Sequence, residues 1–156
     1  MASLAPDLNR RGTLARALAL AFATCSSSLL VLPASASPKD AAELLHRLAN
    51  GTPSPGRISI RAPDIAENGN AVPVAIRVES PMTEADFVRE VHVVAEGNPN
   101  PGVASFFFGP SSGRAEVQFR IRLAQSQRIS AVARMSDGSL WGATREIRVT
   151  LGGCGG

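Results

Sequence analysis

The sequence predicts an all-β fold, an immunoglobulin-like antiparallel β-sandwich preceded by a short N-terminal helix. Two observations support this prediction. After residue 57, apolar and polar residues alternate with a period of two in short stretches, as in strands that bury one face. Turn sequences rich in Asn, Pro, Gly and Asp separate these stretches at a spacing typical of a sandwich of about seven strands.

The first 36 residues have the pattern of a secretory signal peptide. Arg10 and Arg11 precede an apolar stretch at 14–32, and an Ala-x-Ala site ends at Ala36, so we expect cleavage between Ala36 and Ser37. The paired arginines are typical of twin-arginine export. We therefore expect a periplasmic protein.

Two alternatives to this export route remain open. Thr13 stands where the twin-arginine motif usually has a hydrophobic residue, which leaves the ordinary route for unfolded chains. Cys25 raises the alternative of a lipid-anchored protein, although apolar sequence continues beyond it to a better cleavage site. Cleavage after Ala36 would remove Cys25 and leave Cys154 as the single cysteine of the mature chain.

The mature chain has the size of one domain and a balanced charge. Removing 36 of 156 residues leaves 120, and removing three arginines and one aspartate with them leaves 13 basic and 12 acidic residues. This balance argues against nucleic acid as a partner. We expect a signal peptide at 1–36, a helix and linker at 37–56, the sandwich at 57–151 and a glycine arm at 152–156.

The expected helix follows the signal peptide directly. Ser37 suits the N-cap, Pro38 the first turn, and Asp40 the positive end of the helix dipole. Leucines at positions 44, 45 and 48 form an apolar stripe, and Asn50-Gly51 is a stop signal.

The alternating stretches then predict the strands in order, at 58–61, 72–78, 88–95, 103–108, 115–123, 129–135, 140–143 and 145–151. In 115–123 every apolar residue points to one side, so this strand should have one dry face. Asp137-Gly138 should close a tight hairpin. Because the last strand leads directly into Gly152, the arm should leave the sandwich from a rigid strand end.

The C-terminal sequence Gly152-Gly153-Cys154-Gly155-Gly156 is the strongest functional signal. A thiolate is a soft nucleophile, and glycines leave the backbone around it free and slim. Fully extended, these five residues could reach roughly 17 Å from the body. An unpaired cysteine in an exported protein indicates either a reactive thiol or a disulfide with another chain. This pattern favours a covalent carrier. Two alternatives remain: the cysteine only forms a disulfide that links two chains into a dimer, or the tail is a disordered remnant without a function.

Other site chemistry is sparse. His46 and His92 have no Cys, Asp or Glu partner at metal-ligand spacing, so we interpret both as ordinary surface or core residues. Asp64 and Glu67 fit a solvated turn better than a catalytic pair. Phe106-Phe107-Phe108 puts aromatic rings on both faces of one strand, which indicates either a protein interface or a strand buried on both sides.

Four stretches are distinctive: ENGNAVPV at 67–74, ESPMTEADFV at 79–88, SGRAEV at 112–117 and the terminal GGCGG. In these stretches the sequence resembles the SoxY family of sulfur carriers from the periplasmic thiosulfate-oxidising system. The resemblance covers nearly the whole mature chain. It implies that Cys154 is the covalent attachment point for sulfur and that the protein forms a heterodimer with SoxZ.

The resemblance also implies a reaction cycle carried out by partners. A cytochrome, SoxAX, would join thiosulfate to Cys154 as an S-thiosulfonate. A hydrolase, SoxB, would release sulfate and leave a persulfide, and a sulfur dehydrogenase, where present, would oxidise the remaining sulfur. The chain itself is then not an enzyme, and we expect it to need no cofactor and no metal.

Two other classes of function stay open. The chain could be an exported binding module whose tail cysteine only forms a disulfide between chains. It could also be a thiol enzyme, although the mature sequence offers no resolving cysteine.

Overall fold

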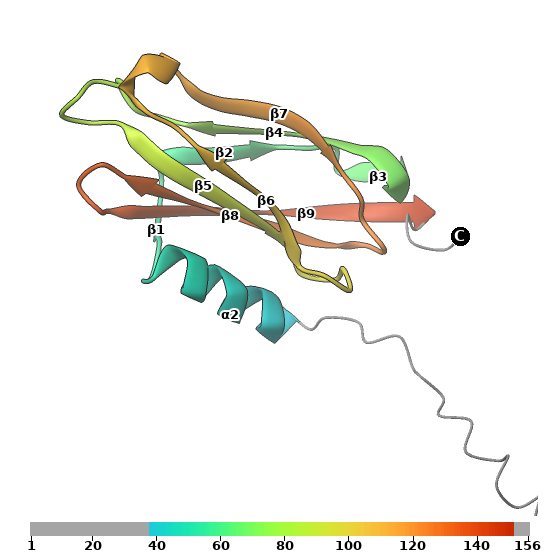
Figure 1. Cartoon of the computed structure of the whole chain (residues 1–156). Helices are drawn as coiled ribbons and strands as arrows, with labels where there is room; N and C mark the ends of the chain where they lie inside the picture. Colours follow the sequence, from blue (N-terminus) through green and yellow to red (C-terminus); the bar gives the residue numbers. More distant parts are fainter. Residues whose placement is uncertain (1–37, 152–156) are drawn as a thin grey trace, which may run out of the picture. The chain divides into compact units, whose positions relative to one another are not determined.

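The computed structural model describes residues 38–151, which form two packed β-sheets and one helix (Figure 1). The small sheet has the antiparallel order β2-β4-β7, formed by Ile58–Arg61, Val72–Val78 and Ala115–Ile121. The large sheet has the order β1-β9-β8-β5-β6, formed by Ser54–Pro55, Leu140–Leu151, Gln127–Met135, Val88–Ala95 and Gly102–Phe107. A further strand, β3 (Ile65–Asn68), pairs with β9.

The strand order is that of an immunoglobulin-like sandwich. Strands β2, β4 and β7 take the places of A, B and E, and β6, β5, β8 and β9 take those of C′, C, F and G. The predicted fold class is therefore confirmed. Two short 3₁₀ helices, η1 (Gly69–Ala71) and η2 (Pro110–Ser112), lie at the two ends of the small sheet, before β4 and before β7.

The core lies between the sheets and follows from the alternation of the strands. Val74 and Ile76 of β4 face Val91, Ile129 and Ile147 of the large sheet, and all five side chains are buried. The expected dry face of 115–123 is also present: its apolar side chains are buried or pack against the core, while the polar ones between them point outward.

Helix α2 (Pro38–Ala49) packs on β5 and β8, on the face of the large sheet that is turned away from the core (Figure 1). The predicted stop signal is confirmed, because Asn50 has a positive φ of 50° and donates its N–H to the His46 carbonyl. Arg134 of β8 donates to the Leu48 and Ala49 carbonyls at 3.1 and 2.8 Å, which ties the end of the helix to the sheet.

Three features differ from the expectations. Strands β1 and β3 were not predicted, and both pair with β9 in parallel, so the large sheet is not purely antiparallel. Residues 140–151 form one strand instead of two, because β8 pairs with this segment continuously from Leu140 to Ile147, across Gly142. Within residues 38–151, no helix is long and apolar enough to cross a membrane.

Candidate functional site: the root of the C-terminal arm

The predicted attachment site, Cys154, and the arm glycines Gly152, Gly153, Gly155 and Gly156 lie outside the described residues. The export motif Arg10-Arg11 and the cleavage site at Ala36 and Ser37 lie outside them as well. The structure does describe the strand end from which the arm continues. We call residues 148–151 the arm root.

Strand β3 holds one side of the arm root. The two strands run parallel, with Ala66 opposite Val149 and Asn68 opposite Leu151. The Thr150 hydroxyl lies 3.2 Å from the Ala66 carbonyl and 3.3 Å from the Glu67 carbonyl, to which it can donate. The β9 strand is therefore bonded to its neighbour up to Leu151, the last described residue.

A serine holds the other side. Strand β8 begins at Gln127, opposite Ile147, so it does not reach Val149. Ser126 replaces it: its hydroxyl accepts the Val149 N–H at 2.8 Å and lies 3.3 Å from the Val149 carbonyl. One side chain thus serves both backbone groups of a strand-end residue.

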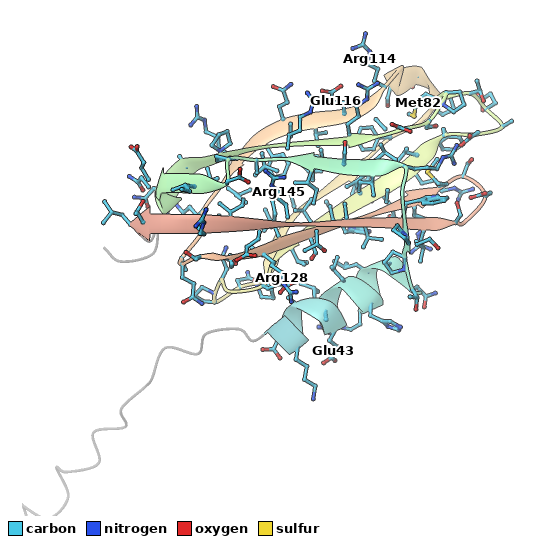
Figure 2. The ribbon with its side chains drawn as sticks, turned by 180° about the vertical axis from the view of Figure 1, so that it is seen from behind. Glu43, Met82, Arg114, Glu116, Arg128 and Arg145 are labelled. Carbon is cyan, nitrogen blue, oxygen red and sulfur yellow. The ribbon has the colours of Figure 1, made fainter. Side chains whose placement is uncertain are left out.

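An ion pair fixes the approach to the root. Arg145 Nη2 lies 2.6 Å from the Asp64 carboxylate in the turn before β3, and it donates to the Ala62 carbonyl at 3.4 Å (Figure 2). The Asp64 carbonyl also accepts the Arg148 N–H. Asp64 therefore positions β3 against β9, and the expected solvated turn has a structural function.

The surface around the root has apolar and charged parts. Leu151 is 69% exposed and Ile65 is 53% exposed, which is high for large apolar side chains. Glu67 and Arg148 are exposed beside them. These four side chains form the exposed surface of the arm root and of β3 beside it.

The two histidines have no role at the root. His46 is exposed on α2. His92 is buried on β5, where its Nδ1 lies 2.8 Å from the Ser105 hydroxyl and its Nε2 lies 3.5 Å from the Glu90 carboxylate. Among residues 38–151, no three His, Cys, Asp or Glu side chains lie close enough together to hold a metal ion.

The Ser105, His92 and Glu90 arrangement was not predicted, because it depends on the pairing of β5 with β6. That register places His92 opposite Ser105, and the period of two places Glu90 on the same face. The Glu90 carboxylate is closer to Arg134, at 2.6 Å, than to His92. Since Arg134 binds the last carbonyls of α2, we interpret the cluster as the joint between helix and sheet.

The three phenylalanines are divided between core and solvent. Phe106 packs against Phe119 with ring centroids 5.0 Å apart, and Phe108 also packs on the core. Phe107 points the other way and is 74% exposed. Of the two interpretations left open by the sequence, the strand is thus not buried on both sides.

Comparison with known proteins identifies the family. The family model described as sulfur oxidation protein SoxY matches residues 46–154. This chain belongs to the SoxY family. Among solved structures, the SoxY sulfur carrier from Chlorobium limicola f thiosulfatophilum is similar with 30% identity and a TM-score of 0.61, covering 74% of this chain and 100% of that one.

The SoxY fold extends to proteins with other names. A superoxide reductase (neelaredoxin) from Ignicoccus hospitalis is similar with 26% identity and a TM-score of 0.53, covering 72% of this chain and 92% of that one. A crystal structure titled as a putative superoxide reductase from Thermotoga maritima, at 22% identity and a TM-score of 0.50, covers 59% of this chain and 84% of that one and shows shared fold alone. A search of curated proteins gave no match.

Proposed function

We propose that this SoxY-family protein is a periplasmic carrier that holds thiosulfate-derived sulfur covalently on Cys154 and presents it to partner enzymes. The observation that supports the proposal most is the arm root. Hydrogen bonds on both sides hold β9 to its last described residues, and the cysteine follows Leu151 by three positions. A rigid base with a slim glycine arm suits a sulfur atom that has to enter the site of another protein.

Each step of the proposed cycle balances in atoms and electrons when the partners that the family implies take part. Joining the Cys154 thiolate to the outer sulfur of thiosulfate removes two electrons, which the SoxAX cytochrome would accept. Hydrolysis by SoxB would then add water, release sulfate with two protons and leave the Cys154 persulfide. A sulfur dehydrogenase would remove six electrons from that outer sulfur and add the oxygens of three waters, which gives a sulfonate that a second hydrolysis releases as sulfate to restore the Cys154 thiolate. This chain supplies the attachment atom and its presentation, not the catalysis.

Tethering explains why such a carrier is useful. The intermediate stays bound while the catalysts change, and each catalyst meets it at a raised effective concentration. Each partner can also keep a narrow and protected channel, because the cysteine side chain is the only side chain on the arm that has to enter.

The direct test is the intact mass of the mature protein, purified without reductant from cells exposed to thiosulfate. Adducts with the mass of a thiosulfonate or persulfide, located on Cys154 and removed by reductant, are the expected result. The Cys154→Ser variant, treated in parallel, should carry none. A bare thiol during active thiosulfate consumption would contradict the carrier function.

We also propose a heterodimer with SoxZ. Phe107 supports a protein interface, because aromatic side chains are enriched among the residues that anchor interfaces and this one is 74% exposed. It lies on β6, an edge strand of the large sheet. Co-expression of this chain with SoxZ, followed by size-exclusion chromatography, should give a one-to-one complex; separate monomers at the concentrations of the assay would contradict it.

The alternative is a binding module whose cysteine only links two chains. The same Cys154→Ser variant separates the two functions. A binding module would keep its partner and its biological activity as the serine variant, whereas a carrier would keep the partner and lose thiosulfate oxidation.

The proposed export route depends on the leader sequence at 1–36. We propose a signal peptide at 1–36 that directs the chain to the periplasm through the paired arginines. N-terminal sequencing of the mature protein should begin at Ser37. Replacing Arg10 and Arg11 with lysine should block export if the twin-arginine route is used and leave it intact if the ordinary route is used.

A further inference from the structure

The outer face of the small sheet carries arginines that have no carboxylate partner among residues 38–151. Arg61 of β2, Arg77 of β4 and Arg120 of β7 all point away from the core and are exposed. None of them lies within 4.0 Å of an Asp or Glu oxygen in the described part of the chain. By contrast, four arginines elsewhere, at positions 57, 128, 134 and 145, each form such an ion pair.

The charge of this face is one-sided. Its outward side chains on β2, β4 and β7 include three arginines and one carboxylate, Glu116, which gives a net charge of +2. Glu116 lies opposite Arg77 in the register but forms no ion pair with it. Directly before β7, Arg114 also projects away from the sheet (Figure 2), and the exposed Glu79, directly after β4, lies at the same end. The face is therefore more positive than the mature chain as a whole, which has 13 basic and 12 acidic residues.

Between the arginines lies a hollow with an apolar floor. Strand β2 ends at Arg61, opposite Ala75, so β4 has no neighbour on that side at Pro73. Proline tolerates this position because its missing N–H faces no partner strand there. The resulting hollow has a volume of about 530 Å³ and is lined by Ala62, Pro63, Pro73, Ala75 and Gln118, with Arg61 and Arg120 on either side.

The spacing of the two arginines fits an extended peptide. Arg61 and Arg120 lie on strands two places apart and are offset by two residues along β4, which separates their Cα atoms by roughly 12 Å. Four residues of extended chain cover that distance. The planar guanidinium group binds carboxylates through two parallel hydrogen bonds, whereas the floor of proline and alanine accepts aliphatic side-chain stems.

We propose that this face, the outer surface of β2, β4 and β7, is the docking surface for an acidic segment of a partner protein. The positive charge of the face favours a segment that carries carboxylates. A nucleic acid fits less well, because the one aromatic side chain on these three strands, Phe119, packs on Phe106 at the core, and because the mature chain is not basic overall. The inference does not depend on the sulfur chemistry proposed above.

The surface lies near the arm root. Arg120 donates to the Ala71 carbonyl at 3.3 Å, and Ala71 is three residues beyond Asn68, which pairs with Leu151. A partner seated on this face would therefore have the end of β9 beside it. Docking there places the partner on the side where the C-terminal residues begin.

The test uses the mature protein labelled with ¹⁵N and titrated with poly-L-glutamate at low ionic strength. Amide shifts should concentrate on β2, β4 and β7. The triple variant R61Q/R77Q/R120Q should bind at least about tenfold more weakly, since three exposed charge pairs together are worth about that factor. The matched control K39Q/R47Q/R89Q removes the same charge from exposed basic residues on α2 and β5 and should keep the affinity of the parent protein.

Three results would overturn the proposal. Equal loss of affinity in both triple variants would show attraction by net charge alone. Tighter binding of a single-stranded oligonucleotide would assign the face to nucleic acid, and saturation of the same amides by inorganic sulfate, with displacement of polyglutamate, would reduce it to a small-anion site.

Glu116→Gln adds an independent check: removing the one carboxylate should strengthen polyglutamate binding, and unchanged or weaker binding contradicts the proposal.

Discussion

Ser126→Ala should loosen the arm root and leave the rest of the sandwich intact. The Ser126 hydroxyl accepts the Val149 N–H at 2.8 Å and can donate to the Val149 carbonyl at 3.3 Å, beyond the point where β8 pairs with β9. A hydrogen bond of this kind contributes about 1 kcal/mol net, and the longer second one adds less because water can replace it. A total of roughly 1.4 kcal/mol corresponds to a tenfold increase in local opening.

Native-state hydrogen exchange measures this opening at the Val149 amide. The expected result is about tenfold faster exchange there, with unchanged exchange at Ile147, which is fully buried in the same strand. Ser136→Ala is the matched control, because the Ser136 hydroxyl also accepts one N–H, from Phe87, and lies within bonding distance of one carbonyl, that of Ala85. Unchanged exchange at Val149 in Ser126→Ala, or the same increase in Ser136→Ala, would refute the anchoring by Ser126.

Three further predictions concern the arm, the core and pH. Gly153→Val should keep the fold and slow sulfur loading by partner enzymes, because a β-branched side chain adds bulk and stiffens the arm; full loading and release would remove the argument for a slim arm. Phe106→Ala should lower the free energy of unfolding by about 3 kcal/mol, while Phe107→Ala should change it by less than about 0.5 kcal/mol, as urea denaturation can measure; similar losses would contradict the assignment of the two faces. The Ser139 hydroxyl first, and the Ser139 backbone N–H second, donate hydrogen bonds to the Asp137 carboxylate and lower its pKa below the ordinary 3.8. This stabilisation is therefore present above about pH 4 and is lost as the pH falls through the folded value. Thermal denaturation of Asp137→Asn with an unaltered pH dependence below about pH 4 would contradict it.

The sequence predicts those parts of the fold that depend on local pattern. Strands such as β4 and β7 alternate strictly because one face of each meets the core and the other meets water. Helix α2 is also predictable, since its cap, its leucine stripe and its Asn50-Gly51 stop all lie within one short segment. These signals need no knowledge of what lies across the sheet.

The parts that could not be predicted depend on neighbours that are distant in sequence. Ile65–Asn68 has no strong alternation, and it becomes strand β3 only because β9 offers a free edge beside it. The pairing of Arg145 with Asp64, 81 residues apart, and the contact of His92 with Ser105 likewise require the sheet register. The terminal cysteine shows the opposite case: its chemistry can be inferred from five residues of sequence, whereas its surroundings lie outside the described residues.

The arm and the arginine face also set a limit on how a partner can dock. Cys154 follows Leu151 by three residues, so its Cα can lie at most roughly 11 Å from that of Leu151. A thiol confined to a sphere of that radius has an effective concentration on the order of 0.3 M. That advantage exists only for a catalytic centre within the same radius of Leu151. Arg120 bonds to Ala71, three residues beyond the Asn68 that pairs with Leu151, so a partner on the arginine face starts next to this strand end. A partner bound to α2, on the other side of the large sheet, would need its channel to extend around the edge of that sheet to reach Leu151.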